Sequence, residues 1–193
     1  QSMSEIRTFL AFPIPKEMKG YFKNMLEPII DRQDKINWVK RENIHITLNY
    51  LGETESENIE EHARQIESVV NKFPPFKLGT TDTGIFPHAN EPRVLWVGSA
   101  PYDTTLSSFK QKLDRELTHL GYRLDNRQFQ PHITLARVKT ISRKSSFIHK
   151  FLTTEVREFN FEVDTVVWMK STLTSAGAEY EELKSFKFNS GGQ

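Results

Sequence analysis

The chain has 193 residues, of which 37% are apolar and 14 are phenylalanine, a composition typical of a folded protein with one sizeable core or two small lobes. It has no cysteine, which excludes disulfides and thiolate metal sites, and no apolar run near the roughly 20 residues that span a bilayer. The start lacks a secretory signal pattern, so a cytoplasmic location is expected. A net charge of +1 is low for a protein that grips a long duplex, so a nucleic-acid partner would be contacted at a short segment or an end.

The first half of the chain alternates strand and helix patterns. A strand is predicted over 6–12 and is stopped by prolines, and apolar residues at helical spacing predict a helix from 16 to about 30. A strand from 43 to about 52 follows. A helix starts after the capping pattern at 54–57, and a strand is predicted from about 76 to 86.

The same order then repeats. It gives a strand at 93–98, a helix over 106–120, a strand from 131, a short helix at 147–152 and a strand from 159 to 170. A last strand, about 178–188, has no partner in the first half. The offset between the two copies is 87 residues, which predicts two similar lobes, roughly the first and second halves of the chain. The loop 87–92 is the expected crossing between them, and residues 3–193 are expected to form a single domain.

Both copies contain His-Ile-Thr-Leu, at His45 to Leu48 and at His132 to Leu135, and the histidines are 87 positions apart (132 minus 45). Side chains two apart on a strand share a face, so each strand presents one imidazole and one hydroxyl, from Thr47 and Thr134, while the isoleucines and leucines point into a core. A pseudo-twofold axis between the lobes would bring the two strands together across a cleft.

Two facing imidazoles suit general acid–base chemistry on a phosphoester, because one accepts a proton from water while the other donates one to the leaving oxygen. The threonine hydroxyls can donate hydrogen bonds to non-bridging phosphate oxygens. Zinc is the competing interpretation. Each strand supplies only one histidine, and neither motif holds a carboxylate or thiolate ligand, so no metal is expected.

Four further residues are candidates for substrate contact. Phe9 and Trp96 occupy corresponding strand positions and either could stack on a base, although a place in the core is the alternative for both. Arg7 shares the face of Phe9 and is expected near the cleft. Strict alternation puts Arg137 on the face away from His132, so it contacts phosphate only if the strand ends or bulges there.

These residues resemble the two-histidine phosphoesterases, and among them the bacterial LigT-like RNA 2′,3′-cyclic phosphodiesterases, also called 2′–5′ RNA ligases. The resemblance covers nearly the whole chain. The segments that carry it are Arg7 to Pro15, Asn43 to Leu48 with Leu51-Gly52, Phe86-Pro87, Pro92 to Gly98, and Pro131 to Arg137. Phe12-Pro13 departs from relatives, which often have an aliphatic and a polar residue there.

The resemblance implies a bilobal α+β fold of two antiparallel-sheet lobes with outer helices. It also implies opening of a nucleoside or RNA-terminal 2′,3′-cyclic phosphate to a 2′-phosphate without metal or other cofactor. His45 and His132 would be catalytic, with His132 as the base and His45 as the acid. We expect a monomer with no obligate protein partner and no membrane attachment. A non-catalytic RNA-end-binding module, and 2′–5′ ligase or phosphodiesterase activity, remain the alternatives.

Overall fold

The computed structural model describes residues 5–191, so positions 3, 4, 192 and 193 of the expected domain lie outside the described residues. The main elements follow the expected order of strands and helices. The strands are β1 (Glu5–Pro13), β2 (Lys35–Trp38), β3 (His45–Glu55), β4 (Phe76–His88), β5 (Glu91–Pro101), β6 (His132–Thr140), β7 (Asn160–Val163), β8 (Thr165–Thr174) and β9 (Gly177–Lys187). The α-helices are α1 (Lys16–Met25), α2 (Ile59–Val70), α3 (Thr105–His119) and α4 (Phe147–Leu152).

Two sequence predictions of element boundaries are wrong, and one strand was missed. Helix α1 ends at Met25 and a short 3₁₀ turn at Glu27–Ile29 follows, because Pro28 cannot donate the next helical hydrogen bond. The single strand expected at 159–170 is two strands, β7 and β8, separated at Asp164. The four-residue strand β2 was not predicted, because it is too short for a periodic pattern to show.

The nine strands of residues 5–191 form one sheet in the order β7-β4-β5-β6-β3-β1-β8-β9, with β2 paired to β6. The order is symmetric about its centre. The offset of 87 residues relates β3 to β6, β1 to β5 and β4 to β8, and the terminal strands β7 and β9 occupy corresponding places. The repeat found in the sequence is therefore a repeat of the sheet.

The sheet has two halves, β7-β4-β5-β6 and β3-β1-β8-β9, which we call half-sheets. They do not correspond to the two halves of the chain. Strand β1 pairs with β3 and with the C-terminal strand β8, which pairs in turn with β9, while β4 pairs with β5 and with β7. The segment 87–92 does not cross between the half-sheets as expected, because Pro87 pairs with Pro92 and His88 with Glu91 in a β4–β5 hairpin.

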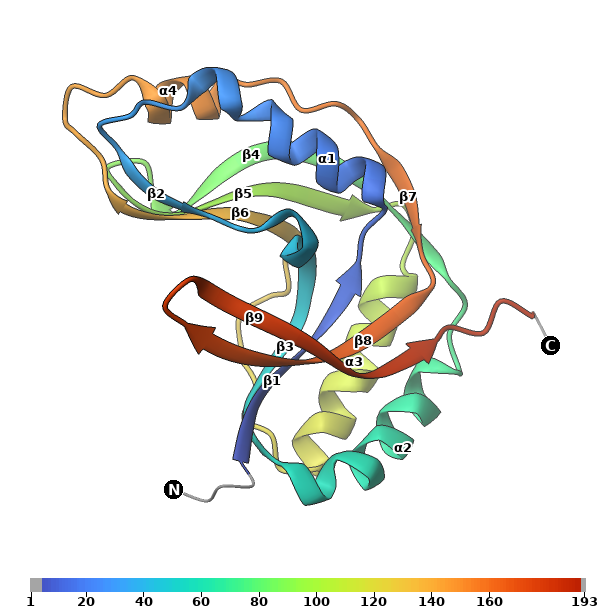
Figure 1. Ribbon diagram of the computed structural model, residues 1–193. Helices are drawn as coiled ribbons and strands as arrows, with labels where there is room; N and C mark the ends of the chain where they lie inside the picture. The colour runs from blue at the N-terminus through green and yellow to red at the C-terminus, as the bar shows by residue number, and fades with distance from the viewer. Residues whose placement is uncertain (1–4, 192–193) are drawn as a thin grey trace.

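The helices cover one face of this curled sheet, which leaves the other face to the two motifs. Figure 1 shows α1 and α4 over the half with β4, β5 and β6, and α2 and α3 over the half with β1, β3 and β8. Helix α1 thus packs on the half-sheet to which its preceding strand β1 does not belong, as the ring contacts of Tyr21 and Phe22 with Phe159 also indicate, at centroid distances of 5.2 and 6.2 Å. We call the face away from the helices the inner face.

The main core lies between the sheet and these helices, and it includes fully buried residues from both half-sheets, such as Leu10, Ile46, Leu95, Ile133 and Trp168. A second, small cluster of Phe9, Ala11 and Val167 packs on the inner face with Met169 and Tyr180. The alternation along β1 explains this division, because Phe9 and Ala11 point to the opposite side from Leu10. No helix among residues 5–191 is long and apolar enough to cross a membrane.

Candidate active site

His45 and His132 are the first residues of β3 and β6, the two strands at the centre of the sheet. These strands pair antiparallel at one point, Ile46 with Ile133, and both isoleucines are fully buried on the helix side. The residues on either side of each isoleucine therefore point to the inner face. In the register of this pair, His45 lies across from Thr134 and Thr47 lies across from His132. The structure thus brings both motifs together on one surface.

The two imidazoles are held in the same orientation by backbone carbonyls. Nδ1 of His45 lies 2.6 Å from the carbonyl oxygen of Asn43, and Nδ1 of His132 lies 2.7 Å from that of Gln130. A carbonyl oxygen only accepts, so each Nδ1 carries a hydrogen and the Nε2 of each neutral ring is an acceptor. At His45 this acceptor is already occupied, because the Thr47 hydroxyl, whose Oγ1 lies 2.8 Å from Nε2, donates a hydrogen bond to it.

Aromatic rings enclose His45. The Phe9 ring stacks on the imidazole at a centroid distance of 5.1 Å, and Tyr180 from β9 meets it edge-on at 5.5 Å. Burial in these surroundings lowers the pKa of His45; the hydrogen bond to Asn43 opposes that shift, and the charges of Lys19 and His132 add to it.

A second set of rings surrounds His132. Phe86 meets the imidazole edge-on at 5.3 Å, and the Trp96 ring lies tilted at 6.0 Å. The Trp96 indole lies directly over Gly84, since a Cβ built on that glycine would overlap the ring. Gly84 is the cross-strand partner of Trp96, so a missing side chain on β4 makes room for the ring beside His132.

A β-bulge turns Arg137 towards the motif. Leu95 pairs with Ala136 but Trp96 pairs with Thr134, so Leu135 is an extra residue in β6. Leu135 and Ala136 are both buried on the helix side, and Arg137 therefore returns to the face of His132 and Thr134. The sequence expectation from strict alternation placed Arg137 on the other face and is wrong; the bulge named there as the exception is present.

The same irregularity occurs in β3. Leu48 is skipped between the Ala11–Thr47 and Leu10–Asn49 pairs, so Tyr50 lies on the inner face, at the position that corresponds to Arg137. Tyr50 is 65% exposed and its ring lies 6.2 Å from that of Phe9. Both motifs are therefore extended to His-x-Thr-x-x followed by a polar residue on the same face.

The sequence analysis did not find Tyr180, Tyr50 and Phe86 as site residues. The pKa of Tyr180 is raised by burial and by Tyr50, and lowered by Arg137, which places all three side chains near one another. The 87-residue offset could have identified Tyr50 from Arg137. Tyr180 had no such signal, because the 87-residue offset in the sequence relates β9 to no equivalent strand, although β7 occupies the corresponding place in the sheet.

The other candidates for substrate contact differ in their exposure. Phe9 is 4% exposed and contacts His45 rather than offering a free face, whereas Phe86 is 41% exposed. Arg7 is exposed on the inner face, further along β1 from Phe9. Its backbone partners in the neighbouring strands are Glu53 of β3 and Ser171 of β8. Among residues 5–191, no group of three or more histidine, cysteine and acidic side chains is arranged to hold a metal ion.

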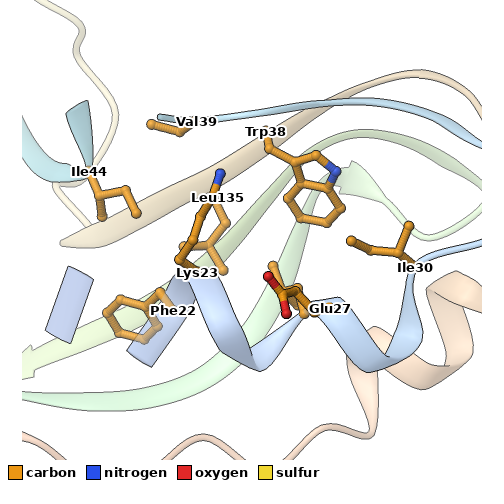
Figure 2. Close-up of a pocket in the computed structure, with 9 residues that line it drawn as sticks. Phe22, Lys23, Glu27, Ile30, Trp38, Val39, Ile44 and Leu135 are labelled. Carbon is orange, nitrogen blue, oxygen red and sulfur yellow. The ribbon is translucent and has the colours of Figure 1, made fainter. Parts of the chain in front are cut away.

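A separate apolar cavity of about 110 Å³ lies on the helix side of the same strands (Figure 2). Its walls include Phe22 of α1, Trp38 of β2, and Ile44 and Leu135, which are sequence neighbours of His45 and Thr134. Lys23 and Glu27 also line it. Because these side chains face away from the imidazoles, the cavity is not part of the candidate active site.

The chain matches the model of the 2′-5′ RNA ligase superfamily over residues 24–174, and it belongs to this family. It is 33% identical to the RNA 2′,3′-cyclic phosphodiesterase of Methanocaldococcus jannaschii, over 94% of this chain and 100% of that protein. It is 31% identical to the protein of the same name from Thermotoga maritima, over 96% of this chain and 97% of that one. The family expected from the sequence is confirmed, and these relatives carry the name of the expected enzyme class.

Solved structures show the same fold. The protein TT0787 of Thermus thermophilus has a TM-score of 0.80 at 22% identity, covering 97% of this chain and 100% of that one. Escherichia coli LigT complexed with 3′-AMP has a TM-score of 0.78 at 21% identity, covering 95% and 98%. The expected α+β architecture of antiparallel sheet with outer helices is confirmed, and the two expected lobes are the halves of one continuous pseudo-twofold sheet.

Proposed function

We propose that this protein is a metal-independent RNA 2′,3′-cyclic phosphodiesterase in which His45 and His132 are the catalytic acid–base pair. The observation that carries the proposal is the shared orientation of the two imidazoles. Each donates Nδ1–H to a backbone carbonyl and so has its Nε2 available for proton transfer on the inner face. The names of the relatives supply the substrate class, an RNA 2′,3′-cyclic phosphate.

In the proposed reaction a water oxygen attacks phosphorus and the bond from phosphorus to the ribose O3′ breaks. One imidazole Nε2 takes a proton from the water, and the protonated Nε2 of the other gives one to O3′, which leaves a 3′-hydroxyl and a 2′-phosphate. After each turnover the histidine that acted as base is protonated and the one that acted as acid is neutral. A phosphate bound between β3 and β6 could reach both imidazoles, since the two strands are adjacent and each carries its histidine on the inner face.

We assign proton donation to His45 and water activation to His132. In the free protein the lowered pKa of His45 favours its neutral form, so the acid must gain a proton when substrate binds. The negative charge of the bound phosphodiester supplies the reason, because an adjacent anion raises the pKa of an imidazole. A substrate whose leaving group departs without protonation should rescue a His45→Ala variant but not a His132→Ala variant. The reverse pattern would exchange the two roles.

Five further side chains are proposed to bind a phosphate or the base. Thr134 and Thr47 lie across from the histidines and can donate to non-bridging oxygens, Thr47 after releasing Nε2 of His45. Arg137, turned to this face by the bulge, supplies a positive charge near Tyr180. Trp96 packs beside His132 and can shape the base site. Arg7 remains a candidate for a more distant phosphate.

The test is to follow hydrolysis of adenosine 2′,3′-cyclic phosphate by ³¹P NMR in the presence of excess EDTA. The proposal predicts a single product, adenosine 2′-phosphate, at an undiminished rate. Loss of activity that zinc or manganese restores would overturn the metal-independent mechanism. Tight binding of the cyclic nucleotide without turnover would instead make the protein an RNA-end-binding module.

A further inference from the structure

Three cations gather beside His45, outside the acid–base pair. Lys16 and Lys19 belong to α1, and Arg41 opens the 3₁₀ turn Arg41–Asn43 that leads into β3. The Lys19 Nζ donates to the carbonyl oxygen of Glu42 at 3.4 Å, which ties the helix to this turn. The Arg41 guanidinium lies against α1, since a Cβ built on Gly20 would be 3.1 Å from its Nη2.

The charge of this cluster is largely uncompensated. Among the ion pairs of residues 5–191, none involves Lys16, Lys19 or Arg41. Burial lowers the pKa of Lys19; the charge of Glu42 opposes this shift, while Lys16 and Arg41 add to it. Glu42 is one carboxylate against three cations, and Glu17 at the start of α1 pairs with Arg157 instead. A protein that keeps these cations together in the free state holds an anion-binding surface ready.

The cluster breaks the pseudo-twofold symmetry of the site. At the offset of 87 residues, Lys16 corresponds to Asp103, Lys19 to Leu106 and Arg41 to Gln128. Of the cations near the segment before His132, Lys110, which sits over the Phe129 ring, contacts Asp114 at 2.6 Å and Arg127 contacts Asp125 at 2.5 Å, while Arg123 is exposed. The three positions that correspond to Lys16, Lys19 and Arg41 therefore hold no cation, and the cluster on the His45 side is not repeated at those positions on the His132 side.

We propose that Lys16, Lys19 and Arg41 bind the phosphodiesters that precede a 2′,3′-cyclic phosphate end, so that the preferred substrate is an RNA oligonucleotide rather than a mononucleotide. This rests on the proposed function. A 2′,3′-cyclic phosphate occurs at the 3′ end of an RNA, so further phosphates lie only on its 5′ side. A cation cluster that has no counterpart at the symmetry-related positions fits such a one-sided polyanion, and it sets the direction in which the RNA leaves the active site.

The experiment compares kcat/KM for adenosine 2′,3′-cyclic phosphate with that for the trinucleotide ApApA ending in a 2′,3′-cyclic phosphate. The test variant is Lys16→Gln with Arg41→Gln, and Lys19 is left in place because its charge also acts on His45. Lys112→Gln with Arg115→Gln is the control: it removes the same two charges from exposed positions of α3, the corresponding helix. Circular dichroism and thermal unfolding check that both variants fold.

We expect the test variant to lose roughly five- to tenfold in kcat/KM on the trinucleotide at low salt and less than twofold on the mononucleotide, with the control near wild type. The salt dependence on the trinucleotide should fall by about one power of salt concentration for each charge removed. Equal losses on both substrates, or no loss on the trinucleotide, would overturn the inference. If wild type hydrolyses neither substrate, the proposed function itself fails.

Discussion

The carbonyl oxygens of Asn43 and Gln130, 87 residues apart in the chain, make the same contact, each accepting a hydrogen bond from Nδ1 of the histidine two positions later. This contact fixes the ring and its tautomer before any substrate arrives. A side-chain substitution at Asn43 or Gln130 would leave the carbonyl in place. The backbone just before each strand therefore sets the site as much as the motif itself.

The charge of Lys19 is expected to hold down the pKa of His45. Lys19→Met should raise that pKa, measured from the His45 imidazole resonances by NMR, while Lys23→Met on the same helix should leave it unchanged. An unchanged His45 pKa in Lys19→Met would contradict the electrostatic link. Since the folded pKa lies below the ordinary 6.5, the unfolded chain takes up this proton first, and His45 should lower the unfolding free energy as pH falls below about 6.5.

Gly84 is expected to tolerate no side chain. In Gly84→Ala the new methyl group would overlap the Trp96 indole, so the ring must leave its place beside His132. We predict a loss of activity of at least roughly tenfold, together with a shift in tryptophan fluorescence. The double variant Gly84→Ala with Trp96→Leu should be more stable than Gly84→Ala alone, because the smaller leucine removes the overlap with the new methyl group. A fully active Gly84→Ala enzyme would show that the position of Trp96 does not matter.

Replacing Phe9 should mainly lower stability, whereas replacing Phe86 should mainly weaken substrate affinity. Phe9→Ala removes a buried ring and should lower the unfolding free energy by about 3–5 kcal/mol. Phe86→Ala removes a ring that is 41% exposed, and if that ring stacks on a base, substrate affinity should weaken by roughly 1–3 kcal/mol with little change in stability. Equal affinity of Phe86→Ala and wild type for adenosine 2′-phosphate would remove Phe86 from the base site.

Gly20→Ala should stabilise the protein while weakening its hold on RNA. Glycine inside a helix costs about 0.5–1 kcal/mol relative to alanine, and the group that the new methyl meets is the flexible end of Arg41. Thermal unfolding should therefore shift upward. Displacement of Arg41 should reduce activity on the trinucleotide more than on the mononucleotide. A destabilised Gly20→Ala protein would mean that Arg41 cannot move away.

The repeat in the sequence predicted the symmetric part of the structure. Both histidine strands, their faces and the helices that follow came from local periodicity and the offset of 87 residues, because these depend on neighbours in the chain. The pairing of β1 with β8 and the packing of α1 on the other half-sheet could not be predicted, since local patterns do not state which strands pair. The orientation of Arg137 depends on a bulge at Leu135. The only sign of this bulge in the sequence is that two adjacent residues, Leu135 and Ala136, are apolar.

The most direct test of the account is the rate at which His45→Ala, His132→Ala and the double variant hydrolyse adenosine 2′,3′-cyclic phosphate, with folding verified by circular dichroism. We predict that each single variant loses roughly 10²–10⁴-fold in turnover, and that the double variant is little worse than either, because the two imidazoles act as one unit. The wild-type rate should show a bell-shaped dependence on pH. A folded single variant that retains the wild-type rate would contradict the two-histidine mechanism.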